Sequence, residues 1–426
     1  MKAKRMIVLL IITALIVTMA VPAAAAGHHG MTLKINGIEM TAAMEVVDGR
    51  AQIANAFLNK LPGLTVSETG YTPLREFFEA DGATVVWDGT TRTIDVTWRN
   101  SSGEWNARDL MLRSNELLME YNTYQMTGSM VMDMIITAAG MEMPTGPMEV
   151  TFDAAMQYDP LNMYVRQEMD MAAMMMSMAE ELGETEDMPE GLDGPMVTEL
   201  LWTEEAIYQK MPLSDQWIRM DLAGMDTMNM LTQMMQTSPQ QSMELMDAFG
   251  MLYVFGEDVE MDGREYYTLS TYVDADTYRK VFEEMMGGMN FAEMVPAEEG
   301  MTDEEAADMQ AELSRVIDAM MATMTMDYYI DSYINKETLL TDRMDIDMMM
   351  TYSMDETVSP EGPVTMAMKM TGSYEMHSYG EPIELPDVSD SITTEEMMQL
   401  QLEEQEELEQ EAAELDDETE AEDTGE

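Results

Sequence analysis

Apolar and polar residues alternate along three segments of the chain. Residues 344–350 read MDIDMMM, and MVMDM at 130–134 and MAMKM at 366–370 repeat the pattern. Because successive side chains on a strand point to opposite faces, each segment is predicted to be a half-buried antiparallel strand. The residues on the apolar faces would be Met130, Met132, Met134, Met344, Ile346, Met348, Met350, Met366, Met368 and Met370.

Strand and helix patterns fill most of the chain beyond residue 100. Further strands are predicted at 148–158, 162–171, 205–222, 263–273 and 324–335. A helix with one apolar face is expected over 107–121, and helix-rich stretches over 225–249 and 275–323. A helix followed by many antiparallel strands, with helices inserted late, predicts an α+β fold.

Residues 31–99 differ in composition from the residues that follow, since they hold only three of the 57 methionines. Asn36-Gly37 and Asp88-Gly89 are turn signals between short strand patterns. A helix is predicted within residues 71–82, where apolar residues take i, i+3, i+4 spacing. The sequence therefore predicts a small β-rich α/β module over 31–100, followed by a larger domain over 106–388.

The order ING, VDGR and PLREFFEADGATVVWDGTTRTIDV resembles the small domain named for the N-terminal region of copper amine oxidases. That domain recurs on surface proteins of Gram-positive bacteria, and here it has a longer insert before PLREF. The resemblance implies a non-catalytic stalk or docking module. It implies no copper site, because the three histidines, His28, His29 and His377, lie outside the segment.

Four later segments, IYQKMPLSDQWIRMDL, YYTLSTYVDADTYRKVFEEM, YYIDSYINKETLLTDRMDIDM and YGEPIELPD, resemble the LolA/LppX-like proteins of the bacterial envelope. The similarity is greatest to an uncharacterised Gram-positive branch of them. It implies an open, curved antiparallel half-barrel with helices on its concave face and an apolar cavity that holds acyl chains. Many relatives carry an N-terminal lipid-modified cysteine, which this chain lacks.

The N-terminus predicts export. Lys2, Lys4 and Arg5 precede the apolar run Met6–Val21, and small residues follow up to a predicted cleavage point after Ala26, so residues 1–26 are interpreted as a signal peptide. The run is shorter than the roughly 20 residues that span a membrane. With no cysteine in the chain, disulfides and thiol catalysis are excluded.

The charge is strongly acidic, with 83 acidic and 21 basic residues and a net charge of −62. Such a polyanion is repelled by nucleic acids and by anionic lipid surfaces, so neither is expected as a partner. The segment 391–426 has no basic residue and is interpreted as a solvated, disordered acidic tail.

The methionine rows have three interpretations. In a half-barrel they would line the ligand cavity, because flexible, polarizable methionine adapts to irregular ligands. Methionine could instead substitute for leucine in an ordinary packed core. Soft thioethers also suit Cu(I), but methionine pairs occur throughout the large domain, which favours a compositional habit over a dedicated site.

Other candidate sites are weak. DVEMDGREYYTL has calcium-loop spacing at first, but Leu269 stands where a bidentate glutamate is needed, so Asp262-Gly263 is better explained as a hairpin turn. Cleavage after Ala26 would expose Gly27-His28-His29, which can chelate Cu(II), although a polar spacer is favoured. No nucleophile–base constellation, phosphate loop or zinc motif is present, so neither an enzyme nor a cofactor is expected.

Together these patterns predict a secreted, non-enzymatic envelope protein that binds a hydrophobic small molecule or lipid in a methionine-lined cavity. A cell-wall or surface component is a further expected partner, and no membrane-spanning segment is expected after cleavage. The alternatives are a structural or adhesive surface protein with no ligand, or a methionine-rich copper-binding or oxidant-buffering protein.

Overall fold

The computed structural model describes residues 30–138, 141–170, 195–210, 216–222, 238–273, 325–354 and 362–394, with single residues at 315, 323, 396, 397, 399 and 400. Several predictions lie outside the described residues. They are the signal peptide, the Gly27-His28-His29 site, the helices predicted over 225–237 and most of 275–323, and the acidic tail beyond residue 400.

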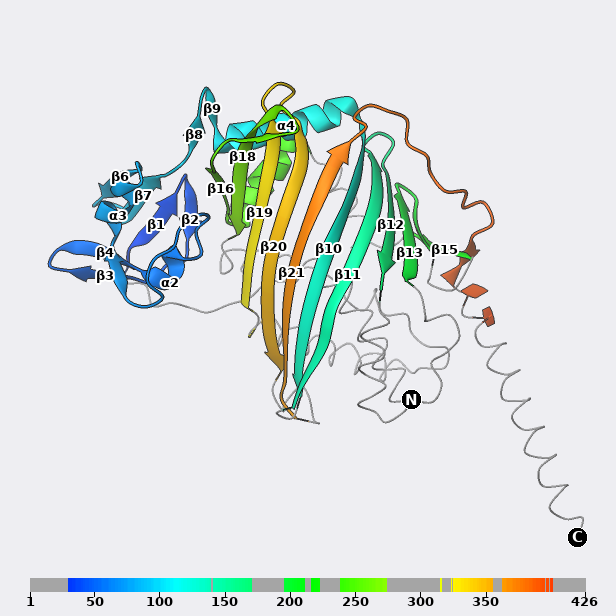
Figure 1. The fold of residues 1–426 in the computed structure, drawn as a ribbon, viewed down its shortest axis with the longest axis horizontal. Helices are drawn as coiled ribbons and strands as arrows, with labels where there is room; N and C mark the ends of the chain where they lie inside the picture. Colours follow the sequence, from blue (N-terminus) through cyan, green and yellow to red (C-terminus); the bar gives the residue numbers. More distant parts are fainter. Residues whose placement is uncertain are drawn as a thin grey trace, which may run out of the picture.

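Residues 30–98, the N-terminal module, contain two small sheets and two short helices (Figure 1). The four-stranded sheet has the order β2-β1-β7-β6, from β1 (Thr32–Ile35), β2 (Ile38–Met40), β6 (Thr84–Asp88) and β7 (Thr93–Thr97). The three-stranded sheet joins β3 (Met44–Val47), β4 (Arg50–Ala54) and β5 (Tyr71–Pro73). The helices are α2 (Asn55–Leu58) and α3 (Leu74–Ala80). The predicted helix and the two hairpins are confirmed.

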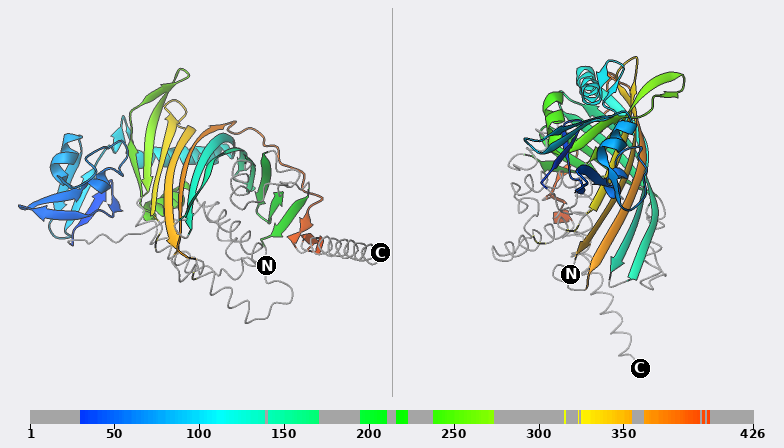
Figure 2. Two further views of the ribbon diagram at one scale, coloured as in Figure 1. Left: turned by 60° about the horizontal axis from the view of Figure 1, so that its bottom comes forward. Right: turned by 90° about the vertical axis from the view of Figure 1, so that its left-hand side faces the viewer.

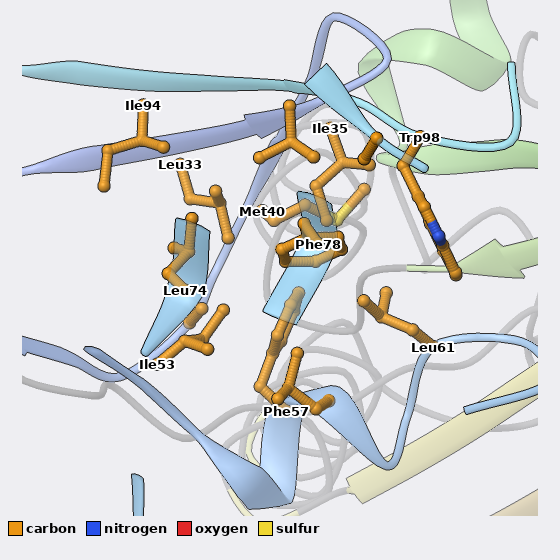
Figure 3. Close-up of a cluster of buried hydrophobic side chains, with 14 of the residues drawn as sticks. Leu33, Ile35, Met40, Ile53, Phe57, Leu61, Leu74, Phe78, Ile94 and Trp98 are labelled. Atoms are coloured by element: carbon orange, nitrogen blue, oxygen red, sulfur yellow. The ribbon is translucent and has the colours of Figure 1, made fainter. Parts of the chain in front are cut away.

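The N-terminal module has a core of branched and aromatic side chains (Figure 3). Phe78 of α3 is fully buried and packs edge-to-face on Trp98, with ring centroids 5.8 Å apart. The Trp98 indole N–H donates to Asp81 at 2.6 Å, and the Arg99 guanidinium, 4.9 Å from the Trp98 ring centroid, also pairs with Asp81. The end of the module is therefore fixed by both packing and polar contacts.

A short hairpin, β8 (Ser101–Ser102) and β9 (Trp105–Asn106), leads into α4 (Ala107–Tyr121). The Asn106 side chain caps α4 by accepting from the backbone N–H of Asp109 at 2.8 Å. A second helix, α7 (Pro239–Ala248), begins with a capping box between Ser238 and Gln241. Both helices follow sequence signals, and α4 matches its predicted range.

The rest of the described chain forms one 13-stranded sheet with the order β16-β18-β19-β20-β21-β10-β11-β12-β13-β14-β15-β22, with β17 paired to β18. Its strands are β10 (Thr123–Ala138), β11 (Met141–Gln157), β12 (Asn162–Met169), β13 (Met196–Thr203), β14 (Ala206–Lys210), β15 (Trp217–Asp221), β16 (Met251–Phe255), β17 (Val259–Met261), β18 (Arg264–Val273), β19 (Thr325–Asn335), β20 (Thr341–Met354), β21 (Val364–His377) and β22 (Ile392–Thr393). The predicted strands are present, except that the stretch 205–222 holds two antiparallel strands, β14 and β15, rather than one. β13, β16, β17 and β22 were not predicted, and β22 lies within residues 391–426, which the sequence had indicated to be a disordered tail.

The sheet is open and curved, and α7 lies on the inside of the curve (Figure 2). The described chain is mostly strand with few helices, as an open half-barrel requires. The predicted turn at Asp262-Gly263 is confirmed, since both residues have positive φ and join β17 to β18.

The N-terminal module packs against one edge of the large sheet. Leu252 and Val254 of β16 and Tyr272 of β18 belong to the same buried cluster as the module's own core. The Asn36 side chain donates to the Tyr253 carbonyl at 3.1 Å, and the Phe255 N–H donates to the Arg99 carbonyl at 2.7 Å. Alternate backbone groups on the outer edge of β16 are thereby satisfied, which protects an otherwise open edge.

The opposite edge is covered by the segment that follows β21. That segment ends in β22, which pairs in parallel with β15 through Ile218–Ile392 and Arg219–Thr393. The Gln216 side chain adds a hydrogen bond to the Asp390 carbonyl at 2.6 Å. Both ends of the described chain thus cover an edge of the same sheet.

Candidate functional site

The candidate site is one face of the large sheet, which we call the methionine face. Residues that pair across antiparallel strands share a face, so the strand register defines its rows. One row runs Tyr328, Met348, Met370, Met132 and Met148, across β19, β20, β21, β10 and β11. All ten residues predicted from the sequence lie on this face.

The methionine face continues over the remaining strands. A second row runs Ile330, Ile346, Gly372, Met130, Val150, Met169 and Met196, and so reaches β13. A third runs Tyr124, Met156, Met163, Trp202, Ile207 and Met220, from β10 to β15. The face is therefore largely apolar from β19 to β15, interrupted by Gln167, Thr198 and Gln209, rather than three separate ladders.

Part of the methionine face is packed shut, and we call this part the sealed cluster. Its buried members are Phe249, Val273, Met326, Met348, Met350, Tyr352 and Met368. Met350 is only 2% exposed and Met368 3%. Leu245 and Met251 pack against the cluster, so α7 and the start of β16 close this end of the face.

Other predicted residues are half-buried. Met132, Met366 and Met370 pack against the margin of the sealed cluster. Met344 lies near α4 in another cluster, with Leu118, Leu340 and Met376. Met130, Met134 and Ile346 are also half-buried. The sequence thus identified the face, while the structure divides its residues into a sealed group and a half-buried group.

Two glycines, Gly128 and Gly372, lie at the middle of the methionine face, where neighbouring positions carry side chains. Gly128 lies between Tyr374 and Phe152, whose rings close over it with centroids 4.6 Å apart. A Cβ at Gly128 would stand 2.5 Å from the Ser373 carbonyl oxygen and 3.0 Å from each ring. Gly128 is therefore required by the close approach of strand and rings, and the ring pair shields it.

Two tyrosines missed by the sequence analysis contribute to the methionine face. Burial raises the pKa of Tyr328 and that of Tyr352 to about 12 each. The Tyr352 hydroxyl donates to the Met366 sulfur at 2.8 Å. Their position follows from register, since Tyr328 pairs with Met348 and Tyr352 with Met366. From the sequence alone, the adjacent residues Tyr328 and Tyr329 do not show which of the two rings lies on the methionine face.

The opposite face of the same strands is polar. A row of Asp331, Asp345, Ser373 and Ser129 crosses β19, β20, β21 and β10. These residues line a shallow hollow of about 450 Å³ together with Arg343 and Tyr329. This hollow lies on the polar face, although Ile346 and Gly372 of the second row also contribute to its lining.

Asp345 is held as a carboxylate in that hollow. Burial by itself raises the pKa of Asp345, but hydrogen bonds from Arg343, Ser373 and Tyr333 outweigh burial and lower it below its ordinary value. Arg343 donates to both Asp345 oxygens, at 2.9 and 3.2 Å. Within the described ranges, no three acidic or histidine side chains are placed to hold a metal ion.

No helix in the described part of the chain is long and apolar enough to cross a membrane.

Comparisons with solved structures find envelope proteins. Lipoprotein LppX of Mycobacterium tuberculosis is 8% identical, with a TM-score of 0.28 over 65% of this chain and 99% of that one. A putative outer membrane lipoprotein-sorting protein domain from Vibrio parahaemolyticus is also 8% identical, with a TM-score of 0.20 over 66% and 97% of the two chains. Both names belong to the group that the sequence resembles.

Sequence comparisons give the family. No curated protein matches the chain. Residues 106–391 match the model described as "Family of unknown function (DUF6612)", and this match begins with the capping residue of α4 and ends just before β22. The resemblance of residues 31–100 to the copper amine oxidase N-terminal domain lies outside the match and stays a prediction. Because the match covers more than half of the chain, this protein belongs to the DUF6612 family.

Proposed function

We propose that this protein is an exported, non-enzymatic carrier that binds a hydrophobic ligand, such as the acyl chains of a lipid, on the methionine face. The observation that carries the proposal is that the face stays largely apolar from β19 to β15, well beyond the sealed cluster. A core that served only stability would need no such apolar surface of half-buried side chains.

The choice of side chain supports the same function. Methionine has three rotatable bonds and a polarizable sulfur, so a methionine wall can adjust to ligands of differing shape. Met130, Met132 and Met370 are half-buried neighbours on β10 and β21. The sequence resemblance to LolA/LppX-like proteins, in which such a face holds acyl chains, agrees with this proposal.

The sealed cluster favours a second candidate, a structural protein whose half-barrel is packed shut. Phe249 of α7 and Met350 of β20 belong to a cluster that leaves no room for a ligand at that point. The two functions differ in what the half-buried methionines do. In the carrier they contact the ligand, whereas in the structural protein they only complete a packing interface.

A fluorescence titration separates the two. We would titrate dansylaminoundecanoic acid into protein purified without detergent and compare Met132→Asp with Val131→Asp. Val131 is the adjacent residue, 42% exposed on the opposite face, so it is a matched control. The carrier predicts saturable binding that Met132→Asp weakens about tenfold or more while Val131→Asp does not, because the charge faces the ligand only at 132. A wild-type protein that takes up no probe would contradict the carrier.

A further inference from the structure

Methionines on the sheet fall into three levels of exposure. Met348, Met350 and Met368 are sealed, with at most 6% of each residue exposed. Met132 and Met370, which pair directly across β10 and β21, are half-buried at the margin of that cluster. The third level is the opposite face, where a methionine on β20 is open to solvent.

That solvent-exposed methionine is Met349, which is 50% exposed and pairs with Lys369 rather than with another apolar residue. It follows Met348 and precedes Met350 in sequence, yet it points away from both. The chain therefore contains neighbouring thioethers with identical chemistry and very different access to solvent.

Thioether oxidation converts an apolar methionine into a polar one. With hydrogen peroxide, the sulfur lone pair attacks one peroxide oxygen, an S–O bond forms, the O–O bond breaks, and the other oxygen leaves as water after proton transfer. Sulfur is oxidised by two electrons and the peroxide is reduced. Methionine sulfoxide is polar and disrupts methionine-rich interfaces, and leucine in the same place cannot undergo this reaction.

From this grading we propose that peroxide oxidation of Met132 and Met370 makes the methionine face polar and releases its hydrophobic ligand, so that these residues form an oxidation-sensitive release site. The inference rests on the proposed function, because it concerns the same face. The sealed cluster keeps its sulfurs away from the oxidant, so release precedes loss of the fold.

One hydrogen bond sets the expected order of oxidation. The Tyr352 hydroxyl donates to the Met366 sulfur at 2.8 Å, which engages a lone pair that would otherwise attack peroxide. Met366 is half-buried like Met370 and packs against the same cluster, but its sulfur is less nucleophilic. The expected order is Met349 first, then Met132 and Met370, then Met366, and the sealed methionines last.

The test uses the full protein loaded with dansylaminoundecanoic acid. Peroxide is added for increasing times and removed with catalase, and probe affinity is then measured by fluorescence. Peptide mass spectrometry locates each added oxygen atom, and circular dichroism follows the fold. We expect no change in affinity while only Met349 is oxidised, and a loss of about tenfold or more once Met132 and Met370 are oxidised, since each sulfoxide places a polar group against the ligand.

Two variants make the result specific. The double variant Met132→Leu/Met370→Leu should bind the probe as the wild type does and keep most of it after peroxide, because the two sulfurs of the release site are absent and only those of neighbours such as Met130 and Met134 can still be oxidised. Met349→Leu should release the probe as the wild type does. Unchanged affinity after oxidation of Met132 and Met370, or equal release from the double variant, would overturn this inference alone. Absence of probe binding before peroxide would overturn the proposed function and this inference with it.

Discussion

The N-terminal module and the methionine face are both apolar, but different side chains build them. The module's core uses Leu33, Ile35, Ile53 and Phe78, each at most 1% exposed. On the methionine face most residues outside the sealed cluster are half-buried, although Val150 and Ile207 on the same rows are also buried. Stiff branched and aromatic residues suit a core with one arrangement, whereas flexible thioethers suit a surface that must accommodate more than one partner.

The comparison also shows that the two regions are not independent. Val254 of β16 and Tyr272 of β18 lie in the large sheet, yet both are buried in the hydrophobic cluster that forms the core of the module. Lys60 of the module forms an ion pair with Asp327 of β19 at 2.9 Å. The module therefore covers the β16 edge of the large sheet through packed and paired side chains.

The largest effect is expected at the sealed cluster. Met348→Asp buries an unpaired charge at a residue only 6% exposed, so it should lower the free energy of unfolding by at least about 3 kcal/mol. Met349→Asp, one residue along on the solvent side, should change it by less than about 0.5 kcal/mol. Urea unfolding of both variants measures the difference. If both variants lose a similar free energy of unfolding, Met348 and Met349 do not lie on a buried and an exposed face of β20 as described.

The shared core at the module boundary gives the next effect. Val254→Asp places a charge at a residue 1% exposed between the module and β16, and should destabilise the protein by about 3 kcal/mol. Val46→Asp, 56% exposed on β3 and opposite Ala51, is the control and should be nearly neutral. If the module did not pack against the sheet, Val254→Asp would leave the stability unchanged. Limited proteolysis would then cut the linker between residues 98 and 107 equally fast in the wild type and in the variant.

A smaller effect is expected at the glycine under the aromatic pair. Gly128→Ala would force a methyl group against the Ser373 carbonyl and the Phe152 and Tyr374 rings, at a cost of about 2 kcal/mol. Gly89→Ala is the control, because its nearest neighbour is the Trp87 side chain at 3.4 Å, an ordinary contact. Thermal unfolding of the two variants measures this difference, and equal midpoints would mean that the ring pair does not close over Gly128.

An effect of similar size is confined to alkaline pH. In Tyr328 and Tyr352 the folded-state pKa, about 12, lies above the ordinary value of 10, so each neutral phenol stabilises the fold below pH 10 and this contribution is lost as pH rises toward 12. Each should contribute about 2 kcal/mol to the loss by pH 12. Tyr328→Phe should flatten the decline in urea midpoint between pH 9 and 12. If Tyr328→Phe leaves the decline in urea midpoint unchanged, the Tyr328 phenol is exposed to water in the folded protein.

The sequence predicted the rows of the methionine face because half-burial leaves an alternating pattern. At 344–350 the alternation even places Met349 outward, as the structure has it. β16 escaped prediction because the module covers one of its faces and α4 and α7 the other, so Met251–Phe255 is apolar throughout. β13 lacks alternation because Leu201 is buried on the polar side of the sheet.

Other features depend on contacts that no local pattern records. The sealed cluster joins Phe249 to residues a hundred positions later, and the module's cover of β16 joins Asn36 to Tyr253. Such long-range pairs decide which methionines are sealed and which remain half-buried. The chemistry of the face was therefore predictable from the sequence, but its division into two groups was not.

The most direct test of the central claim is native mass spectrometry of the protein purified without detergent from a secreting host. The account predicts a discrete added mass that matches a lipid, is lost on extraction with organic solvent, and is absent from Met132→Asp but present in Val131→Asp. A bare protein mass in the wild type, together with no uptake of added fatty acid, would contradict a ligand-binding methionine face and favour the packed, structural half-barrel.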